Sequence, residues 1–277
     1  MVSARIDVVM EAVFSDMISG YALRAPLTTA QTAAHAVKNG ALPPQERPFN
    51  RLTTAPRGRV WGQMRFQTLW EGRAIFAVVL ALGAAGYALH WPWLVALAAG
   101  AFCFCLNFFR DPERKGSQDP RDILSAADGV VTEIVEMEEG EFLKRPMRRI
   151  GVFLSVLDVH TNRMPMDGKV TYINHFPGTY PGPYLDARHK EVSTKNEALT
   201  WAFEGEKATL VVRQITGAIA RRIVPWRKLH DFVKKGERFG MIRFGSRTEV
   251  FVPLDFEITV APGQKVKGGE TVIARQP

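Results

Sequence analysis

The chain has 277 residues, 46% of them hydrophobic, so it is long enough for one good-sized domain with appended segments. A formal net charge of +8 favours an anionic partner, either nucleic acid or an anionic membrane surface. The two cysteines, Cys103 and Cys105, lie in one apolar run and predict neither a disulfide framework nor a metal site.

Residues 1–70 predict a poorly ordered N-terminal extension. From Arg24 to Arg65 the chain is rich in Ala, Thr, Pro and Arg, a composition typical of linkers and disordered segments. The start lacks a basic segment followed by a compact apolar core and a small-residue cleavage site. We therefore expect no signal peptide.

Residues 71–110 predict a membrane-associated helical hairpin. Two apolar arms, 74–89 and 94–109, each reach about 24 Å as helix, against a bilayer core of about 30 Å. Arg73 before the first arm and Arg110 after the second would lie on the same face, as the positive-inside rule prefers. We expect the hairpin to anchor the chain at the cytoplasmic face of the cell membrane. The pattern leaves open whether it spans the bilayer or dips into it, and a pair of buried core helices is the alternative.

Beyond residue 110 the pattern changes to short alternating runs, which are typical of β-strands. The runs cover residues 130–135, 150–154, 169–173, 208–214, 249–252 and 257–260. The motif V-x-x-G-E-x-apolar occurs at Val233–Phe239 and again at Val266–Val272, as in lipoyl-like barrel-sandwich folds. We therefore predict a mainly β (α+β) fold, with a compact β-sandwich or barrel-sandwich-like domain at 111–277. The same repeat supports a rival function, a membrane-anchored lipoyl-like carrier or adaptor module, although the chain has no lysine in a carrier context.

An apolar run at 239–244 stops at Gly245–Ser246, before an alternating run resumes. A β-bulge or a tight turn explains such a pair. The second interpretation is self-cleavage, because a serine hydroxyl can attack the preceding carbonyl and glycine has no Cβ to obstruct the intermediate. Elimination and hydrolysis would then convert the serine into a pyruvoyl group. Two residues alone do not decide between these interpretations.

Five motifs follow one another from residue 108 onward. They are Phe108–Arg114 (FFRDPER), Ser125–Gly129 (SAADG), Asp158–Pro165 (DVHTNRMP), Ala220–Ile223 (ARRI) and Phe239–Arg247 (FGMIRFGSR). In this order and spacing they resemble the short, archaeal-type phosphatidylserine decarboxylases, pyruvoyl enzymes that form phosphatidylethanolamine. The resemblance runs from about residue 75 to the C-terminus.

The resemblance implies self-cleavage at Gly245–Ser246 into a β chain, 1–245, and an α chain, 246–277, which stay associated. Ser246 would become the pyruvoyl group, which forms a Schiff base with the serine amine of phosphatidylserine and accepts electrons as CO2 leaves. No metal and no nucleic acid are implied, and the substrate lies in an anionic membrane. A homo-oligomer stays open. The rival within this enzyme class is a pyruvoyl decarboxylase of a soluble amino acid.

The resemblance also implies roles for three residues. Ser246 is the nucleophile, His160 is a catalytic acid or base, and Asp128 is the carboxylate that orients a histidine toward Ser246. The structural alternative for Asp128 is a plain Asp-Gly turn. Longer family members carry a second histidine three residues after the first, where this chain has Arg163. The sequence therefore leaves open whether His160 serves self-cleavage, decarboxylation or both.

Overall fold

The computed structural model describes residues 65–178, 192–217, 222–243 and 246–277. The predicted extension at 1–70 therefore lies almost wholly outside the described residues, as does Gly245. The helices of the described part are α3 (Arg65–Glu71), α4 (Arg73–Ala88), α5 (Pro92–Phe108) and α6 (Val192–Lys195). The strands are β1 (Asp122–Leu124), β2 (Gly129–Glu139), β3 (Arg145–Leu154), β4 (Thr161–Arg163), β5 (Gly168–Phe176), β6 (Ala198–Glu204), β7 (Thr209–Thr216), β8 (Arg222–Pro225), β9 (Phe232–Val233), β10 (Arg238–Arg243), β11 (Ser246–Val252), β12 (Glu257–Ile258), β13 (Lys265–Val266) and β14 (Val272–Arg275).

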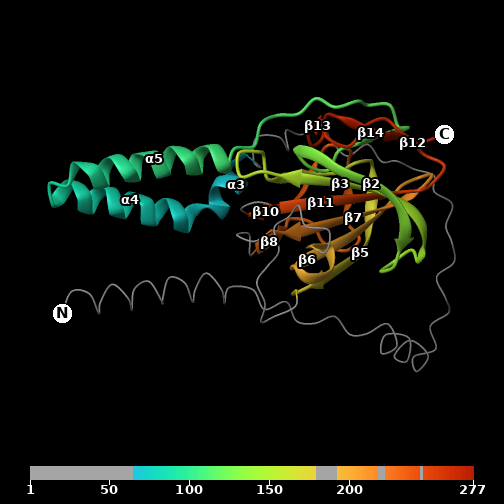
Figure 1. Cartoon of the computed structure of the whole chain (residues 1–277), viewed down its shortest axis with the longest axis horizontal. Helices are drawn as coiled ribbons and strands as arrows, with labels where there is room; N and C mark the ends of the chain where they lie inside the picture. The colour runs from blue at the N-terminus through green and yellow to red at the C-terminus, as the bar shows by residue number, and fades with distance from the viewer. Residues whose placement is uncertain (1–64, 179–191, 218–221, 244–245) are drawn as a thin grey trace, which may run out of the picture. The chain divides into compact units, whose positions relative to one another are not determined.

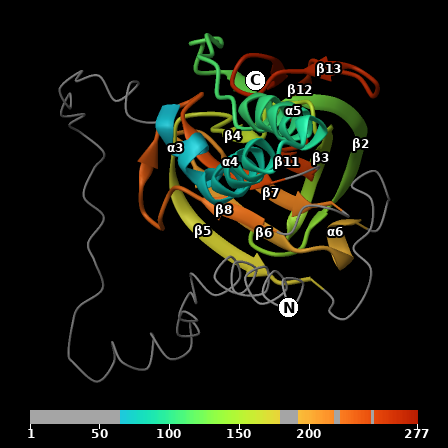
Figure 2. The ribbon, with the colours of Figure 1, turned by 90° about the vertical axis from the view of Figure 1, so that its left-hand side faces the viewer.

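The strands of the described part form antiparallel sheets. The largest has the order β13-β2-β3-β11-β7-β6-β5-β9, and Figure 2 shows it curling around the other strands. Two smaller sheets have the orders β4-β10-β8 and β1-β14-β12. The prediction of a mainly β fold is thus confirmed, and each of the six alternating runs overlaps a strand.

The sequence repeat corresponds to two turns of the same form. In the first copy the chain leaves β9, turns at Gly236 and enters β10; in the second it leaves β13, turns at Gly269 and enters β14. Both glycines have left-handed backbone, with φ of 76° and 73°. A residue with a Cβ would be strained at either position, which explains why both copies carry glycine.

The core lies between the large sheet and the sheet that contains β10. Trp201 and Phe203 of β6 meet Phe239 of β10 edge-on, with ring centroids 5.4 and 5.2 Å apart. All three side chains are fully buried. Burial of each such side chain contributes about 1.5–3 kcal/mol, so these contacts hold β10 firmly against the large sheet.

Helices α4 and α5 lie side by side as an antiparallel hairpin (Figure 1). The chain reverses at His90, which has a φ of 57°, and Pro92 begins α5 where its missing N–H costs nothing. Where α5 ends, Phe108 and Phe109 pack in one apolar cluster with Val224 of β8 and Met241 of β10. The predicted helical hairpin is therefore present. None of the described helices combines the length and the hydropathy that crossing a bilayer requires.

Candidate active site

Ser246 is the first residue of β11, in the middle of the large sheet. It pairs with Leu154 of β3 on one side and Thr216 of β7 on the other. Its side chain is fully buried, and its Oγ makes no hydrogen bond to the described residues. A buried hydroxyl without a partner costs about 1–3 kcal/mol, so its presence calls for an explanation, and a catalytic role is one explanation that fits a serine. Gly245, the other half of the predicted cleavage bond, lies outside the described residues.

His160 lies immediately before β4 and is fully buried. Its Nδ1 is 2.9 Å from the carbonyl oxygen of Asp158, and its ring packs against Phe108 with centroids 4.2 Å apart. A carbonyl oxygen only accepts hydrogen bonds, so Nδ1 must carry the proton of the neutral ring. Nε2 then bears the lone pair that a general base needs.

Burial lowers the pKa of His160 to about 4. The hydrogen bond to the Asp158 carbonyl and the charge of Asp158 raise this pKa, whereas Arg110 lowers it. Burial dominates because an imidazolium ion loses its hydration inside the protein. The imidazole is therefore neutral at pH 7 and can accept a proton there.

The structure brings the surroundings of His160 and Ser246 together. Oγ1 of Thr248, two residues after Ser246, is 3.4 Å from Nδ2 of Asn162, two residues after His160. Side chains two apart on a strand lie on the same face, so Ser246 and Thr248 share the face that meets Asn162. The backbone N–H of Ile242 also donates to the carbonyl of His160 at 3.3 Å, which places His160 beside the end of β10.

A buried chain of hydrogen bonds supports this contact. Asn162 Oδ1 accepts from Gln214 Nε2 at 2.6 Å, and Gln214 Oε1 accepts from Trp201 Nε1 at 2.8 Å. All three side chains are fully buried. Such a network, once satisfied, favours a single arrangement of the strands that carry it. Gln214 and Trp201 were not anticipated from the sequence, because no local pattern shows that β4, β6 and β7 meet.

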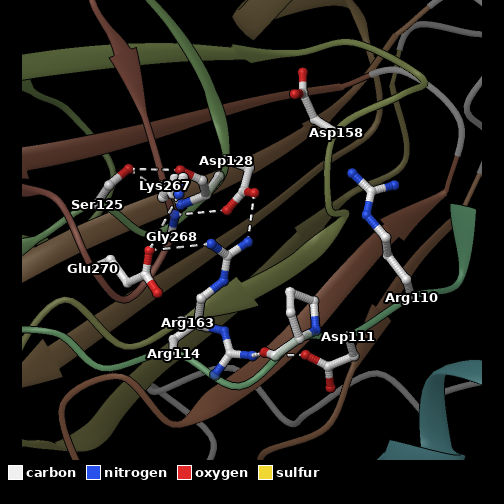
Figure 3. Close-up of polar contacts among 12 residues, drawn as sticks. Arg110, Asp111, Arg114, Ser125, Asp128, Asp158, Arg163, Lys267, Gly268 and Glu270 are labelled. Atoms are coloured by element: carbon white, nitrogen blue, oxygen red, sulfur yellow. Dashed lines mark hydrogen bonds and ion pairs between the residues drawn. The ribbon is translucent and has the colours of Figure 1, made fainter. Parts of the chain in front are cut away.

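Asp128 is part of a different set of contacts (Figure 3). Its Oδ2 accepts from Arg114 Nη2 at 2.6 Å, and its Oδ1 accepts from the backbone N–H of Gly268 at 2.8 Å. Burial raises the pKa of Asp128, while Arg114 and the Gly268 bond lower it. None of the contacts described for Asp128 involves His160, so the predicted orienting role stays a prediction.

Arg163, which the resemblance places where longer family members carry a second histidine, is held by buried contacts. Its guanidinium is buried and donates to Asp111 Oδ1 at 2.7 Å, to the Pro112 carbonyl at 2.8 Å and to the Gly236 carbonyl at 3.1 Å. Arg238 forms a second buried ion pair with Asp111. Arg163 thus fastens the segment after α5 to the turn of the first repeat.

Arginines of the basic stretches at 110–115 and 144–149 form ion pairs within the protein. Arg114 pairs with Asp128 and Glu270, and Arg149 pairs with Glu133. Arg110 differs from them, because its guanidinium donates to the carbonyls of Asn107 and Leu157 and forms no ion pair within the described part of the chain. No carboxylate of the described residues therefore pairs with its positive charge.

Comparison with known proteins places these features in a family. The family model described as phosphatidylserine decarboxylase matches residues 102–274. The protein named phosphatidylserine decarboxylase proenzyme in Syntrophus aciditrophicus is 43% identical over 183 residues, 66% of this chain and 84% of that one. The proteins of the same name in Symbiobacterium thermophilum and Zymomonas mobilis are 40% and 38% identical, over 75% and 74% of this chain and 94% and 85% of theirs.

Proposed function

Because this chain belongs to the phosphatidylserine decarboxylase family, we propose that it is a proenzyme that cleaves itself at Gly245–Ser246 and then converts phosphatidylserine to phosphatidylethanolamine and CO2. The observation that carries this proposal is the buried Oγ of Ser246, which has no hydrogen-bond partner among the described residues. It lies within the segment that matches the family.

Self-cleavage begins with Ser246 as the nucleophile. Its Oγ attacks the carbonyl carbon of Gly245, the C–N bond breaks, and Gly245 is transferred to the hydroxyl as an ester. Elimination releases Gly245 as a carboxylate, and addition of water with loss of ammonia converts the former serine into a pyruvoyl group. We assign His160 as the base that takes the Oγ proton, because its ring is neutral and its Nε2 bears the lone pair.

The surroundings of Ser246 fit a pyruvoyl group. The side chain lies in a buried site, and the backbone on both sides is held by β3 and β7, so the new chain end keeps its position. When present, this group supplies the electron sink for decarboxylation. His160, close to the start of β11, would take up a proton at Nε2 from the lipid ammonium, which must lose protons before it reacts, and would return it to the carbon that loses CO2, so one residue would serve both stages.

The hairpin supports a location at the membrane that holds the substrate. Its outer surface exposes large apolar side chains, and its tip carries two stacked tryptophans with ring centroids 5.9 Å apart. The exposed side chains are Val78, Leu80, Leu82, Tyr87, Leu89, Trp91, Trp93, Leu97, Phe104 and Leu106. Tryptophan and tyrosine favour the interface between lipid and water, so the hairpin would keep the active site at the cytoplasmic face of an anionic membrane.

Intact mass under denaturing conditions tests the proposal. Native protein should give two species, 1–245 and 246–277, the second of 32 residues (277 − 246 + 1). The small chain should be about 17 Da lighter than a peptide that begins with serine, because ammonia is lost. Ser246→Ala should give one uncut, inactive chain. A single full-length species in protein that decarboxylates phosphatidylserine would contradict the proposal.

A further inference from the structure

The end of α3 contacts Arg243, which precedes the proposed cleavage bond, and the end of α5 contacts His160, the proposed base. We call Glu71, Gly72, Phe108 and Phe109 the hairpin base. Glu71 ends α3, and both its backbone oxygen and its Oε2 accept hydrogen bonds from Arg243 Nη2, each at 2.6 Å. Arg243 ends β10 and lies two residues before Gly245. The hairpin base thus holds the last described residue before the predicted cleavage bond.

The other end of the hairpin covers the proposed base. Phe108 is fully buried, and its ring lies against the imidazole of His160 with 36° between the ring planes. Phe108 also belongs to the cluster that contains Met241, two residues before Arg243. A single residue at the end of α5 therefore contacts His160 and shares an apolar cluster with the strand that leads to the cleavage bond.

Gly72 joins these two ends of the hairpin. A Cβ at Gly72 would lie 2.7 Å from the ring of Phe109 and 2.9 Å from the ring of Phe76. Only glycine lets the start of α4 approach the end of α5 this closely. The contacts of Glu71 and Phe108 are consequently parts of one packed unit.

We infer that the hairpin base is part of the self-cleavage site, with Glu71 positioning Arg243 and Phe108 positioning His160. This inference rests on the proposed function and goes beyond it, because it gives the hairpin a role in the reaction besides membrane attachment. Displacement of the hairpin would then move Arg243, which precedes the cleavage bond, and His160, the proposed base.

Of the two positioning residues, Glu71 is expected to have the larger effect, because it supplies the charge that holds Arg243 in place. The side chains of Arg243 and Glu71 are only 12% and 18% exposed. Burial lowers the pKa of Arg243, Glu71 raises it, and the nearby Arg222 and Arg73 lower it. Without Glu71 the guanidinium would face two other cations with no compensating carboxylate, and Arg243 would turn away.

A charge exchange in the full-length chain tests this inference. Glu71→Ala, Glu71→Arg and Arg243→Glu should each slow the appearance of the 246–277 fragment about tenfold, the loss expected for one misplaced charged contact. The double variant Glu71→Arg/Arg243→Glu should recover to within about threefold of the native rate. Glu136→Gln is the matched control, because it removes a carboxylate from a 2.6 Å pair with Arg148 outside the hairpin base.

The outcomes separate the inference from the proposed function. If the native chain stays uncut, the proposed function fails. If the native chain is cut and Glu71→Ala is cut at the same rate, only the inference fails. The inference would also be overturned if the double variant melts at the native temperature but its cleavage rate does not recover. If the double variant does not fold, the cleavage rate of Glu71→Ala decides the inference.

Phe108→Ala provides a readout that a merely structural role would not change. Burial is the main cause that lowers the pKa of His160, and removing the ring admits water, so the midpoint of the pH profile of self-cleavage should rise from its native position toward the ordinary value for histidine. The charged groups recorded around the imidazole, Asp158 and Arg110, are the same in both proteins. Slower cleavage with an unchanged midpoint would remove Phe108 as a positioning residue for His160.

Discussion

At the scale of single residues, Asp128 shows how burial and pairing oppose each other. Burial raises its pKa, and Arg114 opposes this rise through a 2.6 Å ion pair. The two side chains are 13% and 7% exposed, so water would replace Arg114 poorly. The pair therefore stabilises the folded protein mainly because either partner would be costly alone.

Arg114→Leu tests this pair and should destabilise the protein at pH 7 by about 3 kcal/mol, because it leaves a buried carboxylate unpaired. The pKa of Asp128 would rise further above its unfolded value, so the folded state would bind more protons than the unfolded state as the pH falls. The loss of stability should therefore shrink between pH 7 and pH 4.5. Urea unfolding of the uncut Ser246→Ala protein measures it without a second chain.

Arg121→Leu is the control for Arg114→Leu. Arg121 pairs with Asp119 on the surface, with side chains 55% and 35% exposed, so its loss should leave the unfolding free energy nearly unchanged. If Arg114→Leu were equally mild, or if its effect grew as the pH fell, burial of an unpaired carboxylate would not explain the contacts of Asp128.

At the scale of elements, the strands of the proposed small chain pair with strands of the rest of the protein. β11 pairs with β3 and β7, β13 pairs with β2, and β14 pairs with β1. The strands β11, β13 and β14 all belong to the 246–277 fragment. Cutting one peptide bond leaves these ladders and the buried side chains of β11 in place.

The small chain should therefore remain bound after cleavage. Native gel filtration should give one peak that contains both fragments, and only denaturant should separate them. Val250→Asp, which places a charge at a fully buried position of β11, should release the fragment or prevent folding. Two peaks from native protein without denaturant would show that the β11 pairings do not hold the fragment.

At the scale of the whole molecule, the tip and the base of the hairpin should have separable effects. Trp91→Ser with Trp93→Ser should weaken sedimentation with phosphatidylserine-containing vesicles by at least about tenfold, because both rings are exposed at the tip. Self-cleavage should keep its native rate, because neither residue belongs to the hairpin base. Leu229→Ser, at an exposed apolar residue outside the hairpin, should bind vesicles like the native chain. Equal binding by all three proteins would exclude the hairpin as the anchor.

The sequence alone determined the mainly β character of the chain and the family to which it belongs. Alternation identified β2, whose first residues alternate between buried and half-buried positions. It also identified β11 from its sequence pattern, although every residue of β11 is buried in the fold. β6 was not predicted, since Ala198–Phe203 is buried on both faces and carries few polar residues to mark an exposed face. The ordered motifs carried the prediction of Ser246 and His160, which general patterning could not have supplied.

Tertiary structure alone decided which side chains meet. Asp128 bonds Gly268, 140 residues away, and Glu71 bonds Arg243, 172 residues away. A periodic pattern shows which face of a strand is buried but not which strand lies opposite, so these partners follow only from the sheet order. The same reason explains Arg163, which is a plain cation in the sequence and a buried link to Asp111 and Gly236 in the fold.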